Sequence, residues 1–390
     1  MTRQCFLVVL LGTLLLLPVL YQNRCKTSVP PLTVLPTVAS PVAAVDPIME
    51  LDNGRWTRSF MAADGTLYLW GRLQSRDGGR TIEPQTAIDV EKINAAPERA
   101  VFTRPGMFYA LDGPAELESP GVYRVRGWRS TDDLLTLSSE TVRLEVPAGP
   151  SRARQPHEWY GLYVYRTILE MPDGSWRLTM YGNFDVDTLP PLDRSSQQET
   201  KYMMRAFILI SRDQGSSWQY LATIAAPQLG DPVGEGFVEP ALTRLSDGRL
   251  LCILRTGHYY PLYASWSSDG GISWTAPVYT GLDRGCDPCL ITLVDGRVAL
   301  SWGRRFPETW STIDSQGDAA RFKYPGVGVV NLAISSDGGA TWVNTKVAQR
   351  GGSCYSTIFE MAPNIIFLQV EQRFWRVTIQ PLDARAPEMQ

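Results

Sequence analysis

The chain has 390 residues, of which 44% are hydrophobic, so it is long enough to bury a large core. Its formal net charge of −3 leaves no basic surface of the kind that nucleic-acid binding needs, and we expect no nucleic-acid partner. It has only two histidines, and one isolated Cys-x-x-Cys pair at Cys286 and Cys289. We therefore predict no metal site and no cofactor, and either a loop disulfide or two free thiols at this pair.

The N-terminal segment is apolar from Cys5 to Leu20 and follows the positive charge of Arg3, which is typical of a secretory signal or a short signal-anchor. Residues 26–45 are rich in Pro, Thr, Ser and Val, a composition suited to an extended linker. We expect residues 1–25 to direct export and residues 46–390 to form one domain outside the cytoplasm. The protein is then secreted, periplasmic or tethered to a membrane by this segment, depending on whether the signal is cleaved.

Short hairpins recur along the rest of the chain. In each, an apolar run, a two-residue turn and a second apolar run follow one another. The turns are Asp173-Gly174, Asp247-Gly248 and Asp295-Gly296, with weaker copies at Pro363-Asn364 and Asp64-Gly65. Turn pairs of this kind between apolar runs predict β-hairpins.

A second motif, Ser-x-Asp-x-Gly-x-x-Trp, occurs three times, beginning at Ser211, Ser267 and Ser335. It predicts a tight turn in which Ser and Asp side chains bond backbone amides and Gly takes a positive φ. A copy at Ser130 lacks the Gly and Trp. The segment starting at Ser75 fits either a copy without Trp or a loop between inner strands. Such repetition indicates a β-repeat architecture.

This octet is the Asp box of sialidases and related β-propellers, and the chain resembles that superfamily, in particular its bacterial exo-alpha-sialidase-like branch, from about residue 46 to the end. The resemblance implies an all-β fold, a six-bladed β-propeller of the sialidase type, whose last blade is closed by an N-terminal strand. The expected blades are residues 46–99, 100–155, 156–228, 229–280, 281–346 and 347–382. Because the box occurs in both glycosidases and binding proteins, it predicts the fold and not the chemistry.

Four polar residues share one place in the hairpins, nine positions before the second turn residue: Tyr165, Glu239, Asp287 and Tyr355. The innermost strands of a propeller line its central channel, so we expect these side chains to meet at one mouth. Seven positions after the turns the chain returns to the same mouth, at Arg72, Tyr181, Arg255, Gly303 and Glu371, with Arg304 one position further.

The resemblance also implies roles for these residues. Tyr355 lies in a segment similar to the family's nucleophile segment, and Glu239 with Arg255 is similar to the base and one substrate arginine. A tyrosine suits this task because a neutral phenol can approach an anionic sugar. Glu371 stands where the family has a carboxylate that steadies its first arginine. Either Asp77 or Asp287 would be the acid.

The substrate arginines match less well. Arg55 is the best match for the first, with Arg166 as the alternative, and no arginine precedes Ser335 where the third is expected, so Arg304 or Arg305 would have to replace it. A fork of guanidinium groups is what recognises a sialoside carboxylate, so the sequence leaves that substrate in doubt.

Three functions fit this pattern. The first is an exported glycoside hydrolase that releases a terminal acidic sugar from a glycan, with a Tyr/Glu nucleophile pair. The second is a non-catalytic glycan-binding propeller with the same mouth. In the third, the charged residues only close the channel of a structural protein: Arg255 pairs with Glu239, and Arg55 or Arg72 pairs with Glu371.

Overall fold

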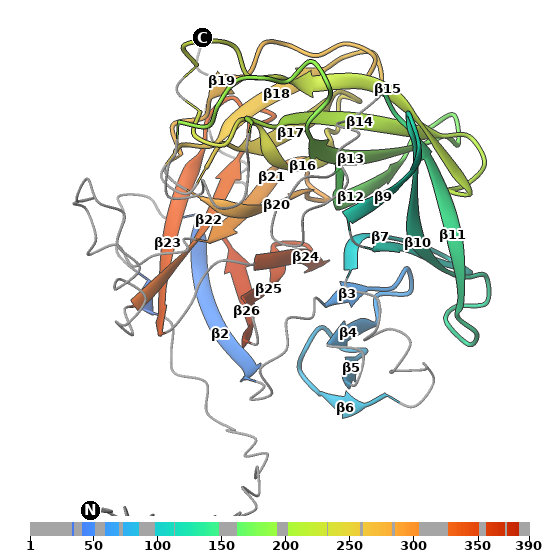
Figure 1. The fold of residues 1–390 in the computed structure, drawn as a ribbon. Helices are drawn as coiled ribbons and strands as arrows, with labels where there is room; N and C mark the ends of the chain where they lie inside the picture. Colours follow the sequence, from blue (N-terminus) through green and yellow to red (C-terminus); the bar gives the residue numbers. More distant parts are fainter. Residues whose placement is uncertain are drawn as a thin grey trace, which may run out of the picture.

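The computed structural model describes residues 33–34, 41–50, 59–69, 73–85, 98–112, 114–147, 162–192, 202–231, 233–257, 260–282, 285–303, 327–350, 356–370 and 373–381. These residues form strands β1 to β26 and contain no helix, as the all-β prediction requires (Figure 1). Within these ranges there is consequently no helical segment that could cross a bilayer.

The strands follow one another in antiparallel groups of four. The first three groups are β3 (Phe60–Met61), β4 (Leu67–Leu69), β5 (Leu73–Ser75) and β6 (Glu83–Pro84); β7 (Glu98–Arg104), β8 (Met107–Asp112), β10 (Val122–Ser130) and β11 (Ser138–Glu145), with β9 (Pro114–Ser119) beside β10; and β12 (Leu162–Glu170), β13 (Trp176–Gly182), β14 (Arg205–Ser211) and β15 (Ser217–Ala225). Each group begins with a predicted hairpin or its counterpart.

The next three groups repeat this order. They are β16 (Val238–Arg244), β17 (Leu250–Arg255), β18 (Tyr263–Ser267) and β19 (Val278–Tyr279); β20 (Cys286–Thr292), β21 (Val298–Gly303), β22 (Val327–Ser335) and β23 (Val343–Arg350); and β24 (Ser356–Ala362), β25 (Ile365–Val370), β26 (Arg373–Ile379) and β2 (Val42–Glu50). The expected N-terminal strand is β2, which pairs antiparallel with β26. It starts at Val42, and β1 (Thr33–Val34) pairs with β23, so strand pairing reaches into the predicted linker.

The second and third groups are joined, which differs from the separate antiparallel blades that we expected. Strand β7 pairs parallel with β12, and β11 pairs parallel with β15, closing a ring of eight strands, β11-β15-β14-β13-β12-β7-β8-β10. Both contacts join equivalent strands, first with first and fourth with fourth. Equivalent strands of successive groups run in the same direction, so they pair in parallel where they meet.

The buried cores lie between successive groups. One core packs Tyr109 of the second group against Trp176 and Trp218 of the third. Others join the third group to the fourth, the fourth to the fifth and the fifth to the sixth. The first group packs on both sides, with Phe60 against the second group and Leu67 against the sixth. The cores therefore form a closed circuit around the molecule.

Five turns share one hydrogen-bond pattern, and we call them the box turns. They begin at Ser75, Ser130, Ser211, Ser267 and Ser335. In each, the Ser hydroxyl accepts the amide four residues later at 2.7–2.9 Å. In each, the Asp carboxylate accepts the amide and hydroxyl of a Ser or Thr four residues after it. Both doubtful copies, at Ser75 and Ser130, thus form the same turn.

Box turns also fasten one group to the next. The backbone carbonyl of Gln214 accepts a bond from Arg129 at 3.0 Å, and that of Gly270 accepts one from Arg177 at 2.8 Å. Arg376 of the sixth group donates to Gly78 of the first. In every case the donor belongs to the group before the box, so these bonds follow the same circuit as the cores.

We expect acid to destabilise the fold through the box turns. Bonds from the amide and hydroxyl of Thr81 lower the pKa of Asp77 to about 2, and those from Ser273 lower that of Asp269 to about 2. An unfolded Asp titrates near about 3.9. Because the folded pKa is lower, the stabilisation is complete above about pH 5 and is lost as pH falls through about 4 toward about 2.

Urea unfolding followed by tryptophan fluorescence at a series of pH values will test this. The urea concentration at the unfolding midpoint should decrease once the pH is below about 4. In Asp269→Asn, which has no carboxylate to titrate at this position, this decrease should be smaller. An unchanged midpoint between pH 5 and pH 2.5 would contradict the assignment.

Candidate active site

Three consecutive first strands are strained at the same end. Strands β12, β16 and β20 each slip register against their partners there. At these bulges Arg166, Glu239 and Asp287 have φ values of 62°, 46° and 54°. A positive φ costs a residue with a side chain about 1–3 kcal/mol, so it persists only where the surrounding structure holds it. Here three charged residues adopt it near the same end of neighbouring strands, with Arg166 one position after Tyr165, the residue that is equivalent to Glu239 and Asp287.

Arg255, at the end of β17, is held between two carboxylates. Its Nη1 donates to Glu239 Oε1 at 2.5 Å, and its Nη2 lies 3.1 Å from Glu235 Oε2. All three side chains are at most 9% exposed. Burial alone would lower the pKa of Arg255, but the charges of Glu235 and Glu239 outweigh it and hold that pKa well above its usual value. Arg255 is therefore a permanent cation.

A second ion pair joins Asp287 to Arg166. Asp287 is completely buried, and its carboxylate accepts a bond from the Tyr165 hydroxyl and one from Arg166 Nη2 at 3.0 Å. Arg166 also donates to the carbonyls of Pro288 at 3.1 Å and Ser356 at 2.5 Å. It thereby ties β12 to β20 and β24.

One backbone bond links the two ion pairs. The Asp287 amide donates to Glu239 Oε2 at 2.6 Å. The linked side chains form what we call the mouth cluster: Tyr165, Arg166, Glu235, Glu239, Arg255 and Asp287. Its carboxylates outnumber its guanidinium groups by three to two.

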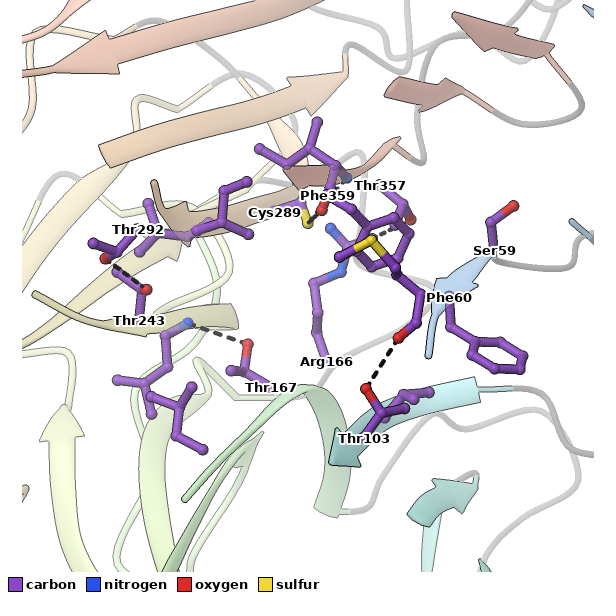
Figure 2. A pocket seen from close by; sticks show the side chains of 17 residues that line it. Ser59, Phe60, Thr103, Arg166, Thr167, Thr243, Cys289, Thr292, Thr357 and Phe359 are labelled. Carbon is purple, nitrogen blue, oxygen red and sulfur yellow. Dashed lines mark hydrogen bonds between the residues drawn. The ribbon is translucent and has the colours of Figure 1, made fainter. Parts of the chain in front are cut away.

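A cavity of about 410 Å³ adjoins the mouth cluster. Its wall includes residues of β3, β7, β12, β16, β20 and β24, the first strands of all six groups. Figure 2 shows the Arg166 side chain extending into it beside Thr357 and Phe359. The rest of the wall is apolar or bears hydroxyl groups, such as Thr243 and Thr292, whose hydroxyls are 3.0 Å apart. Six first strands therefore surround one central space, with the mouth cluster at one end of the bulged strands.

Residues 106–364 match the BNR repeat-like domain. The chain belongs to this family. The predicted relationship to the sialidase superfamily is thus confirmed. No curated protein sequence gives a match.

Two solved sialidase structures share the fold of this BNR repeat-like domain. The Hadza microbial sialidase Hz136 is 16% identical, with a TM-score of 0.51 over 83% of this chain and 65% of that one. The NanB sialidase from Streptococcus pneumoniae is 12% identical, with a TM-score of 0.51 over 88% and 71%. A Dyadobacter fermentans protein of unknown function is 19% identical, with a TM-score of 0.49 over 81% and 84%. At these identities the likeness concerns the fold alone.

Four of the predicted site residues lie in the mouth cluster of the BNR repeat-like domain: Arg166, Glu239, Arg255 and Asp287. The Arg255–Glu239 pair is the one that the channel-closing interpretation predicts. Asp77 lies instead in a box turn, where Ser75 and Thr81 bond its carboxylate. Tyr355, Glu371, Arg55 and Arg304 lie outside the described residues.

The Cys-x-x-Cys pair contains two free thiols, which was one of the two expected forms. Cys286 and Cys289 are both buried, and no disulfide joins them. The Cys286 thiol lies 3.6 Å from the Gly303 carbonyl, while the Cys289 sulfur accepts the Ile358 amide at 3.5 Å. Each thiol therefore contacts a different strand.

Sequence reasoning gave no role to Glu235, which Gly236 holds in place. The Glu235 carbonyl accepts the Met204 amide at 2.9 Å, and the Met204 carbonyl accepts the Phe237 amide at 2.8 Å. Gly236 has φ 91°, and a Cβ there would lie 2.2 Å from the Met204 carbonyl oxygen. The Glu-Gly pair just before Glu239 was the available signal.

We expect Gly236→Ala to lower the free energy of unfolding by about 1–3 kcal/mol more than Gly230→Ala. Gly230 is the matched control, since its φ is 96° but a Cβ there would meet nothing within 4 Å. The backbone strain is therefore shared and only the clash differs. Chemical denaturation of both variants measures the difference in the free energy of unfolding. Equal losses would show that the backbone contact between Gly236 and Met204 is not rigid.

Proposed function

We propose that this protein is an exported glycoside hydrolase, built as a six-bladed β-propeller, that releases a terminal sugar from a glycan. The propeller is supported by the six four-stranded groups, the first strands around one cavity, the closed circuit of cores and the closing strand β2. A concave site at the end of such a channel is the usual place for a ligand.

One observation carries the functional proposal. Bulges near the same end of β12, β16 and β20 hold Arg166, Glu239 and Asp287 in strained backbone conformations, and Asp287 is hydrogen-bonded to both of the other residues. Ion pairs that merely close a channel need no such strain. Strained, buried and charged residues are characteristic of functional sites.

In this proposal Tyr355 is the nucleophile and Glu239 is its base. The phenol gives its proton to the Glu239 carboxylate as its oxygen bonds to the anomeric carbon, and the leaving oxygen departs with the bonding electrons and takes a proton from the acid. Water then attacks the anomeric carbon, breaks its bond to the tyrosine oxygen and releases the sugar. Ser356, next to Tyr355 in the sequence, is fully buried and its carbonyl is bonded by Arg166. Arg166 is then a positioning residue.

Other roles follow from burial. Asp287 is fully buried and bonded by Tyr165 and Arg166, so we give it a positioning role and not that of the acid. Arg55 and Arg304 stay candidates for contact with the substrate, and Glu371 for orienting an arginine. The Asp77 carboxylate is occupied by its turn, which favours another acid.

A panel of chromogenic glycosides that includes a sialoside tests this proposal. Hydrolysis of one member that is lost in Glu239→Gln supports it. If no member of the panel is hydrolysed, the protein is not a hydrolase that acts on simple glycosides.

A glycan-binding propeller is the second candidate, and one observation favours it. Both carboxylate oxygens of Glu239 are bonded, one by Arg255 and the other by the Asp287 amide, so its capacity as a base is reduced. This candidate expects glycan binding without turnover and an affinity that Tyr355→Phe leaves almost unchanged.

Export forms part of the same proposal. The apolar run from Cys5 to Leu20 directs the domain out of the cytoplasm, either released or tethered to a membrane. Cell fractionation should recover the domain outside the cytoplasm. Full-length chain in the cytoplasm with its first residue intact would contradict this.

A further inference from the structure

We infer that Tyr263 and Tyr279 form a subsite beside the mouth cluster, which binds the sugar units next to the terminal sugar. The inference rests on the proposed function and names its substrate class, an oligosaccharide or polysaccharide and not a simple glycoside. The occupant of this surface is thus the leaving part of the glycan.

Both tyrosines lie at the mouth end of the fourth group. Strand β17 ends at Arg255 of the mouth cluster, and the residue before it, Leu254, pairs with Tyr263, the first residue of β18. Tyr263 in turn pairs with Tyr279, the last residue of β19. Figure 1 shows these strands at one edge of the molecule, in the order β17, β18, β19. Because neighbouring strands are about 4.8 Å apart, Tyr279 lies about 10 Å outward from the end of β17.

The exposure of the aromatic rings increases outward along this row. Phe237 is 3% exposed and packs edge-on against Tyr263, with ring centroids 6.0 Å apart. Tyr263 is partly buried, and Tyr279 is 54% exposed. Their ring planes are tilted by 48° at a centroid distance of 6.3 Å, so the two rings are not stacked face to face. The inner ring is therefore held by the core, and the outer ring is presented to solvent.

A fixed turn lies near the inner ring, in the loop between β15 and β16. The Gln228 amide donates to the Asp231 carboxylate at 2.7 Å, and the Asp231 amide donates to the Gln228 carbonyl at 3.1 Å. Burial and then the charge of Asp231 raise the pKa of Tyr263, so this carboxylate is close to the phenol. Leu229, in the same turn, is 91% exposed. The turn thus adds a hydrogen-bond acceptor and an apolar side chain to the surface around the tyrosines.

The chemistry of this surface suits sugars. A sugar ring has faces made of C–H groups and an edge made of hydroxyl groups. A tyrosine has an apolar ring and a polar hydroxyl, so it can pack against such a face while its hydroxyl stays with the polar groups. It also loses little conformational entropy on binding, because its side chain has only two rotatable bonds.

The position of the row identifies the ligand. In the proposed reaction the terminal sugar lies at Glu239, which Arg255 binds at the end of the strand next to Tyr263. A glycan that extends from there along the fourth group crosses Tyr263 first and Tyr279 second. A simple glycoside ends before the second ring.

Matched probes test the inference with the full-length protein. Each pair shares its terminal sugar and anomeric configuration: p-nitrophenyl β-glucoside with cellotriose, p-nitrophenyl α-glucoside with maltotriose, p-nitrophenyl α-mannoside with α-mannotriose, and a methylumbelliferyl sialoside with sialyllactose. Tyr279→Ala should lower kcat/KM for the trisaccharide about fivefold more than for its matching glycoside, because only the trisaccharide reaches this ring. If nothing is cleaved, calorimetry should show the same ratio in Kd.

Leu135→Ala is the matched control. Leu135 is 72% exposed, and it lies in the box turn that begins at Ser130. Box turns follow the ends of the third strands, as at Ser267 in β18, whereas Tyr263 begins that strand at the mouth. Truncating Leu135 should therefore change both members of a pair equally. Tyr279→Ala should fold as this control does, since more than half of the Tyr279 side chain is already in solvent.

The outcomes separate the two proposals. If a trisaccharide binds without being cleaved and Tyr279→Ala removes its advantage over the glycoside, the hydrolase is rejected and the inference is kept. If probes are cleaved and Tyr279→Ala affects both members of a pair equally, the hydrolase is kept and the inference is overturned. If no probe is bound or cleaved, both are rejected.

Discussion

Tyr355→Phe should lower turnover by about 1,000-fold or more and leave glycan affinity within about twofold, because only the attacking hydroxyl is removed. Folding should be preserved, since the ring remains. Single-turnover assays on the best substrate of the panel measure the chemical step, and calorimetry measures binding. A loss confined to kcat would identify a group that acts only in the transition state.

Tyr220→Phe is the control for this variant. The Tyr220 hydroxyl bonds the Thr223 hydroxyl at 2.9 Å within β15, away from the mouth cluster, so this variant should keep full activity. If Tyr355→Phe retains more than about a tenth of the parent turnover, the phenol is not the nucleophile. If it mainly weakens binding, the hydroxyl contacts the ligand instead.

Box turns show how far the sequence could predict this fold. The Trp and Gly of the octet identified three of them, but the hydrogen bonds depend on other residues. All five contain Ser, then Asp two positions later, then Ser or Thr four positions after the Asp. At Ser130 the place of the Gly is taken by Leu134 with φ 69°, a strain that the bonded turn tolerates. The hydroxyl and carboxylate positions alone are shared by all five box turns of the described residues.

The mouth cluster was predictable only in part. Counting from the hairpin turns brought Glu239 and Asp287 to one height, because strands with equal register place equivalent residues together. The bulges at which Glu239 and Asp287 take a positive φ have no signature in composition, and the Arg166–Asp287 pair lies at two of these bulged strands. The parallel contact between β7 and β12 was equally hidden, since it depends on how closely two groups approach.

Arg166→Met should lower the free energy of unfolding by about 3–5 kcal/mol, the largest stability effect that we expect. Asp287 is 0% exposed, and the variant removes the guanidinium that pairs with its buried carboxylate. The carbonyls of Pro288 and Ser356 would lose a donor as well. Urea denaturation of the purified variant measures the loss.

A double variant tests the cause of that loss. Arg166→Met combined with Asp287→Asn also removes the buried charge with which Arg166 pairs, so it should be more stable than Arg166→Met alone by at least about 1 kcal/mol. Arg124→Met breaks an exposed pair with Glu118 and should cost much less stability than Arg166→Met. If the double variant is no more stable than the single one, the carbonyl bonds and not the charge of Asp287 explain why β12, β20 and β24 require an arginine at this position.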